Sequence, residues 1–170
     1  MRPTLAALTA LLFSSCYEPP PSVKPVQGFD ASRYTGKWYE VARLDNSFEK
    51  GLDHTTAEYS LRKDGGLDVV NKGYKKASQQ WKSVTGRAYF VQVPSLGHLK
   101  VSFFRPFYGA YAIFYLDSQY QYSFVSGGEL KYLWMLSRTP TVDNSVKALF
   151  IEKASALGFA TDKLVWVDQQ

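Results

Sequence analysis

The residues that most often carry out chemistry in proteins are scarce in this chain. Among its 170 residues there are two histidines, His54 and His98, and one cysteine, Cys16. An enzyme needs a nucleophile, an acid–base pair or a metal site. The two histidines lie beside polar residues, at a spacing that does not suit a shared metal ion, and we expect both at the surface. The sequence therefore does not favour an enzyme, a metal site or a bound cofactor.

The N-terminal residues suggest a different use for the cysteine. The apolar run at 5–13 is shorter than the ~20 residues that span a bilayer and is typical of a secretory signal peptide. The stretch FSSC at 13–16 resembles a bacterial lipobox, with its leucine four positions before the cysteine instead of three. This implies a lipoprotein signal peptide over 1–15 and a mature chain that begins at lipidated Cys16. A plain signal peptide followed by an unmodified cysteine is the alternative.

Residues 16–28 are expected to form a tether. They include four prolines and lack hydrophobic periodicity, which favours an extended linker between an anchor and a folded domain at 29–170. Tyr17, not aspartate, follows the cysteine. By resemblance to sorted bacterial lipoproteins, this implies the outer membrane, with the domain facing the periplasm. If Cys16 is acylated, no cysteine remains for a disulfide.

The composition narrows the function classes without choosing among them. The formal net charge is +5, and aromatic residues make up 16% of the chain. Such a basic charge suits nucleic acid, anionic lipid head groups or fatty-acid carboxylates. A secretion signal argues against nucleic acid, even though aromatic residues on strands can stack on bases.

From residue 36 onward the apolar residues repeat mainly with a period of two, which predicts strands. Ala57, Tyr59 and Leu61 alternate with polar residues, and KDGG at 63–66 is a hairpin-turn signal. Gly86 predicts a bulge or sharp bend. The spacing of the strand candidates is typical of an antiparallel up-and-down sheet; they are 38–44, 54–62, 66–74, 81–93, 98–104, 110–116, 120–128 and 131–138. Eight such strands can close into a barrel with room for side chains or one small ligand.

The period changes after the eighth strand. Apolar residues in 142–158 fall at helical spacing, with Asp143 or Thr141 available as the N-cap and Gly158 at the C′ position. A helix with one apolar stripe must pack on the outside of another structure. A short strand is expected at 163–167. The predicted fold is all-β, an eight-stranded antiparallel barrel with one C-terminal helix packed outside.

At this point the sequence resembles the lipocalin family, and its bacterial branch in particular. Gly36 and Trp38 match the family's Gly-x-Trp on the first strand, and Arg138 matches the arginine at the end of the eighth. Residues 30–34 look like the short 3₁₀ turn that closes the barrel, whereas 116–120 depart from the family's Thr-Asp-Tyr. The resemblance covers about 28–168. It implies that Arg138 lies over the Trp38 indole as a structural contact.

The resemblance and the alternation together nominate residues for a cavity. If Trp134 shares the inward face of Arg138, it lies about 13 Å along the strand, near mid-cavity. The candidate cavity residues are Trp134, Tyr108, Tyr59, Phe103, Tyr122 and Phe124, with Ala57 and Val101 beside them. Simple packed core is the alternative for each residue, and a one-residue slip would reverse any of them. Strict alternation also turns Glu40 inward, unless a bulge intervenes.

The resemblance implies binding without chemistry. We expect a fatty acid or lysophospholipid, with its acyl tail in the barrel and its head group at the mouth, near arginine or lysine. The alternatives are an anchored barrel that acts through protein contacts without a ligand, and a binder of another small hydrophobic molecule. A homodimer is left open.

Overall fold

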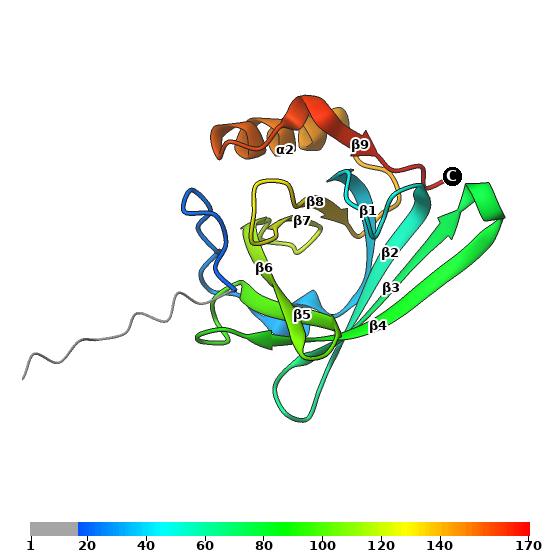
Figure 1. Ribbon diagram of the computed structural model, residues 1–170. Coiled ribbons are helices and arrows are strands. Elements are labelled where there is room, and N and C mark those ends of the chain that lie inside the picture. The colour runs from blue at the N-terminus through cyan, green and yellow to red at the C-terminus, as the bar shows by residue number, and fades with distance from the viewer. Residues whose placement is uncertain (1–16) are drawn as a thin grey trace, which may run out of the picture.

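The computed structural model describes residues 17–170 as a closed barrel. Its strands are β1 (Gly36–Leu44), β2 (Leu52–Leu61), β3 (Leu67–Lys75), β4 (Gln80–Phe90), β5 (His98–Phe104), β6 (Phe107–Leu116), β7 (Tyr122–Ser126), β8 (Leu133–Ser137) and β9 (Leu164–Trp166). Consecutive strands from β1 to β8 pair antiparallel, and β1 also pairs with β8. Figure 1 shows the resulting ring of strands. The predicted eight-stranded barrel is confirmed, with β9 added beside β1.

Helices are few in the described chain. The helix α2 (Asn144–Ala156) lies outside the barrel, as predicted, and ends before Gly158, whose φ is +94°. The short α1 (Ala31–Tyr34) is one α-helical turn where a 3₁₀ turn was expected, capped by the Asp30 carboxylate. Single 3₁₀ turns are η1 (Lys76–Ser78) and η2 (Thr161–Lys163). No helix within residues 17–170 is both long and apolar enough to cross a membrane.

The two ends of the barrel differ. Because β1 starts beside α1 and the strands alternate in direction, α1 and the β2–β3, β4–β5 and β6–β7 connections share one end, which we call the closed end. The connections β1–β2, β3–β4, β5–β6 and β7–β8 lie at the other end, called the open end. The β3–β4 hairpin extends away from β5 and β6 (Figure 1). Only four residue pairs join β4 to β5.

A bulge in β1 decides which side chains enter the barrel. The register with β8 shifts between Glu40 and Ala42, so that Glu40 lies opposite Leu136 and Arg43 lies opposite Trp134. Leu136 and Trp134 belong to the interior cluster. Glu40 and Arg43 therefore both face inward, and the Arg43 Nη1 donates a hydrogen bond of 2.7 Å to the Glu40 Oε1.

Two apolar clusters lie on opposite faces of the barrel wall. The interior cluster includes Trp38, Tyr59 and Val125, whereas the outer cluster joins Phe124 and Met135 to the buried face of α2. The ring of Phe124 lies 4.9 Å from that of Phe150 in α2, centroid to centroid. The expectation that Tyr122 and Phe124 face the interior is wrong, because α2 covers the outer face of β7 and makes it the more apolar one.

Residues 17–28 lie against the barrel instead of forming an extended tether. The Val26 amide donates to the Ile113 carbonyl at 2.8 Å, and Val23 is only 2% exposed. This segment also covers His98, which was expected at the surface but is buried and bonds through Nε2 to the Tyr17 carbonyl at 2.7 Å. The prolines suggested an extended linker, but Val23 and Val26 in the same segment pack against the two apolar clusters.

Gly86 does not mark a bulge. The pairing of β4 with β3 continues through it without a shift in register. A Cβ at this position would come within 2.6 Å of both the Ser102 carbonyl oxygen and a ring carbon of Phe103. The glycine therefore lets β5 approach β4 closely at the point where the two strands part.

Candidate functional site

The closed end is held by Arg138 and Trp38. The Arg138 Cζ lies 3.9 Å from the centroid of the Trp38 ring, and its guanidinium donates to three backbone carbonyls, those of Arg33, Lys37 and Tyr120. Gly36 has a φ of +89°, a conformation that glycine adopts at little cost. The Trp38 Nε1 donates to the Tyr34 carbonyl. Because the Trp38 Nε1 and all three guanidinium nitrogens of Arg138 donate to backbone carbonyls, the contact has a structural role.

A chain of tyrosine hydroxyls crosses the interior above this floor. The Tyr111 hydroxyl lies 2.8 Å from those of both Tyr34 and Tyr59, and the Tyr34 hydroxyl lies 2.9 Å from the Ser123 Oγ. Burial raises the pKa of Tyr34 to about 12, and it also raises the pKa values of Tyr59 and Tyr111. The hydroxyls thus stay neutral and satisfy one another in an otherwise apolar region.

Three aromatic rings lead from the open end into the barrel. Phe48, in the β1–β2 loop, stacks on Tyr132 with 6.0 Å between the ring centroids. Tyr132 in turn stacks on Trp134, with 6.2 Å between the centroids and an interplanar angle of 4°. Phe48 is 62% exposed, whereas Trp134 is half-buried in the interior cluster. We call Phe48, Tyr132 and Trp134 the aromatic ladder. It forms a continuous row of aromatic rings from the exposed β1–β2 loop to the interior cluster.

A buried polar cluster borders the ladder. The Trp134 Nε1 donates to the Glu49 carboxylate at 2.9 Å, and Asn46 Nδ2 donates to the same oxygen. Arg43 holds the base of the loop by donating to the Glu49 and Leu52 carbonyls. Burial, followed by the nearby Glu49 carboxylate, raises the pKa of Glu40 well above its ordinary value, although Arg43 acts in the opposite direction. The β1–β2 loop is thereby fixed to the inner wall.

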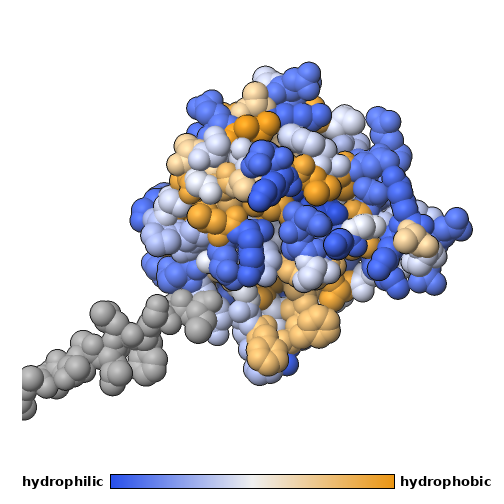
Figure 2. Space-filling view, turned by 45° about the horizontal axis from the view of Figure 1, so that its top comes forward, coloured by the Kyte–Doolittle hydropathy of each residue, from blue (hydrophilic) through white to orange (hydrophobic). Residues whose placement is uncertain are grey.

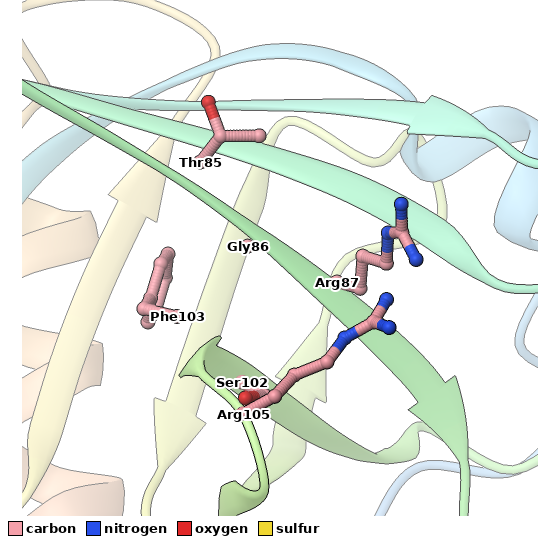
Figure 3. A pocket seen from close by; sticks show the side chains of 6 residues that line it. All are labelled: Thr85, Gly86, Arg87, Ser102, Phe103 and Arg105. Atoms are coloured by element: carbon pink, nitrogen blue, oxygen red, sulfur yellow. The ribbon is translucent and has the colours of Figure 1, made fainter.

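A pocket lies where β4 and β5 part. It has a volume of about 260 Å³ and is lined by Thr85, Gly86, Arg87, Ser102, Phe103 and Arg105. Figure 3 shows the Arg87 and Arg105 side chains extending in the same direction. Arg87 lies within 3.8 Å of Asp68, which also bonds to Arg62, and no ion pair of Arg105 is present within residues 17–170. The Ser102 Oγ is buried and has no hydrogen-bond partner in the described part of the chain. The pocket thus combines cationic groups with one aromatic wall.

The predicted cavity residues divide between the two faces of the barrel. Tyr59, Phe103 and Trp134 lie in the interior cluster, together with Ala57 and Val101. Tyr108 does not line the cavity: Val101 pairs with Gly109, which turns Tyr108 outward, where Lys100 Nζ lies 5.2 Å from its ring centroid. Cys16, the expected lipidation site, lies outside the described residues, as does the signal peptide expected over 1–15.

Sequence reasoning missed several residues of the interior and of the open end. Tyr34 and Tyr111 were not nominated, although the apolar run that contains Tyr111 was recognised as a strand. Phe48 and Glu49 come from a loop, where no periodicity indicates direction. Arg43 turns inward only because of the bulge in β1. Within residues 17–170 no group of three or more His, Cys, Asp or Glu side chains is arranged to hold a metal ion.

Comparisons with known proteins agree with this architecture. Residues 29–169 match the family model of a lipocalin-like domain. The chain is 52% identical over its full length to an outer membrane lipoprotein Blc of Vibrio cholerae, and it covers all of that protein. It is 48% identical to the protein of the same name from Escherichia coli strain K12, with 96% of this chain and 94% of the relative covered.

A solved structure shows the same fold at lower identity. Insecticyanin from the tobacco hornworm Manduca sexta superposes with a TM-score of 0.70 at 19% identity, covering 89% of this chain and 86% of that one. The full-length similarity to outer membrane lipoproteins places this chain at the outer membrane, held by a lipid anchor. The match over 29–169, together with these relatives, shows that the chain belongs to the lipocalin family, in its bacterial Blc branch.

Proposed function

We propose that the protein binds a single-chain amphiphile, a fatty acid or a lysophospholipid, and that it stores or carries this lipid in the cell envelope without chemical change. In this proposal Cys16 bears the lipid anchor, and the barrel faces the periplasm. The membership of the lipocalin family supports the general function, which is binding of a hydrophobic ligand. The lining of the pocket supports the more specific claim that this ligand has an acyl tail and an anionic head group.

The observation that carries the proposal is that Phe103, Arg87 and Arg105 line the same pocket. Phe103 belongs to the interior cluster, yet it borders the same 260 Å³ pocket as the two arginines. A carboxylate or phosphate can accept paired hydrogen bonds from a guanidinium, and the buried Ser102 hydroxyl has no partner among residues 17–170. A ligand with an acidic head and an apolar tail matches both parts of the pocket.

The barrel interior offers surface for the tail. Val101, Phe103 and Trp134 face inward and remain only partly buried, whereas a fully packed core would bury them. Each methylene removed from water contributes about 0.8 kcal/mol before the costs of binding. A long tail therefore gives affinity without any precise polar contact, and we expect selection mainly by tail length.

The test is titration of the purified protein with fatty acids and lysophospholipids, followed by tryptophan fluorescence and native mass spectrometry. We expect saturable one-to-one complexes with ligands that have a long tail and an acidic head. The proposal would be abandoned if no such complex formed with any member of either class.

An anchored barrel that works without a ligand is the second candidate. The specific observation in its favour is the interior itself, where the hydroxyls of Tyr34, Tyr59 and Tyr111 bond to one another and Glu40 pairs with Arg43. These groups fill part of the interior with contacts that need no partner. The same titration separates the two candidates, because this one predicts that no ligand saturates the protein.

A further inference from the structure

The tip of the β5–β6 hairpin presents two exposed aromatic rings. Phe104 and Phe107 pair across the hairpin, separated only by Arg105 and Pro106. Each is 76% exposed, more than any other large hydrophobic residue within 17–170. Figure 2 shows the hydropathy of one face of the molecule, with hydrophobic residues protruding at its lower edge. Adjacent exposed apolar side chains on a short turn are typical of a contact site for a partner or a membrane.

The same two strands hold the beginning of the described chain. The Tyr17 carbonyl bonds to His98 in β5, Lys100 Nζ lies 4.8 Å from the Tyr17 ring centroid, and the Tyr108 ring of β6 lies 6.0 Å away. Residues 17–28 therefore do not act as a free linker between the barrel and the residues before Tyr17. If Cys16 carries the anchor, as proposed, the anchor is attached one residue before Tyr17, which lies against β5.

The hairpin tip lies close to this anchoring point. Lys100 and Phe104 are four residues apart on β5, which corresponds to about 13 Å along the strand. The strand runs from Lys100 toward the open end, where the β5–β6 connection lies. A membrane on the open side of Tyr17 would therefore lie near Phe104 and Phe107 while it takes up the anchor.

The charges around the tip fit the surface of an anionic membrane. Arg105 lies between the two phenylalanines in the sequence, and Arg87 borders the same pocket (Figure 3). Lys100 is on the outer face nearby and contacts the rings of Tyr17 and Tyr108. Basic side chains beside exposed aromatic rings are the combination that binds anionic head groups while the rings enter the interface.

We propose that Phe104 and Phe107 enter the leaflet that carries the lipid anchor, so that the open end of the barrel faces the bilayer. The inference rests on the proposed acylation of Cys16 and deepens the proposed function, because a lipid could then pass between the membrane and the aromatic ladder without crossing open water. The partner of the exposed tip is the bilayer itself, and the anchor holds the protein at a fixed place on it.

The experiment measures which end of the barrel meets the lipid. The full chain is produced in acylated form and placed in vesicles of phosphatidylethanolamine and phosphatidylglycerol. An environment-sensitive fluorophore is attached to Phe107→Cys, whose thiol is the only free one once Cys16 is acylated. Val93→Cys, in the β4–β5 connection at the closed end, is the matched control, with an exposure of 55% against 76%. Lipids with a nitroxide on the acyl chain serve as the quencher.

We expect quenching at position 107 to be several-fold stronger than at position 93. Equal quenching at the two positions, stronger quenching at 93, or protein that does not stay with the vesicles would each overturn the inference. The quenching ratio does not depend on ligand binding. A failed titration with fatty acids would therefore count against the proposed function alone.

A second variant tests the consequence for lipid exchange. In the acylated protein, Phe104→Ser combined with Phe107→Ser should slow the uptake of a fluorescent fatty acid from vesicles several-fold, with the affinity for the same fatty acid added from water unchanged. Because both side chains are largely exposed, the fold should tolerate the change, which the melting temperature checks. Uptake at the rate of the unaltered protein would contradict the inference.

Discussion

The indole Nε1 of Trp134 donates a hydrogen bond of 2.9 Å to the carboxylate of Glu49. This contact joins the wall of the barrel to the β1–β2 loop, and it places the innermost ring of the aromatic ladder beside the buried polar cluster. It also gives Trp134 two separable properties, an apolar face within the interior cluster and a polar edge that bonds to the loop.

The apolar face of Trp134 can be tested by removal. Trp134→Ala should weaken the binding of a long-chain fatty acid by about tenfold, because truncating a half-buried aromatic side chain in a binding site costs roughly 1–2 kcal/mol. Isothermal titration calorimetry measures the affinity. Trp166→Ala is the control, since Trp166 lies in β9 outside the barrel and is 42% exposed. A variant that no longer folds would show that Trp134 is core and not part of a ligand site.

The arginines of the pocket can be tested by varying the ligand head group. Arg105→Gln should weaken the binding of a fatty acid several-fold and leave the corresponding fatty alcohol almost unaffected, because only the acid offers a charged partner to the guanidinium. Arg33→Gln is the control, since Arg33 lies in α1 at the closed end, where its guanidinium donates to the Ser118 carbonyl. Equal effects on the acid and the alcohol would count against a head-group site here.

The close approach at Gly86 predicts a loss of stability. Gly86→Ala should lower the free energy of unfolding by about 1–3 kcal/mol, because the new methyl group would lie 2.6 Å from the Ser102 carbonyl oxygen. Gly109→Ala, in β6 on the other side of β5, should have little effect, since nothing lies within 4 Å of a Cβ there. Urea unfolding compares the two variants. Similar stabilities would indicate that β4 and β5 part more easily than the structure indicates.

The buried Glu40 predicts a dependence of stability on pH. Its pKa is raised well above the ordinary value of 4.5, chiefly by burial, so the folded protein keeps a proton that the unfolded chain releases. The free energy of unfolding should therefore fall as the pH rises from 4.5 toward the raised pKa, by at most about 1.4 kcal/mol per pH unit.

Substitution of Glu40 isolates this effect. Glu40→Gln cannot ionise, so the stability of the variant relative to the unaltered protein should increase with pH over the same range. Urea unfolding at a series of pH values measures both proteins. Glu58→Gln, on the exposed face of β2, is the control. Two parallel stability curves for Glu40→Gln and the unaltered protein would show that Glu40 is ionised in the folded state.

The sequence by itself determined the barrel and its closed end. Alternation with period two in eight segments, followed by a single helical segment, leaves few other arrangements, because each strand needs two neighbours and one apolar face. Gly36, Trp38 and Arg138 could be located by type and spacing, since their roles depend on local backbone and on a fixed separation along the chain.

Only the tertiary structure decided which face each strand turns inward. Alternation predicts two faces but not their direction, and α2 buries the aromatic face of β7 outside the barrel, so that Phe124 lies against Phe150. The bulge in β1 turns Arg43 inward beside Glu40, and residues 17–28 lie against β5 and β6 despite their prolines. In each case the deciding contact comes from a part of the chain distant in sequence, and local residue patterns carry no information about it.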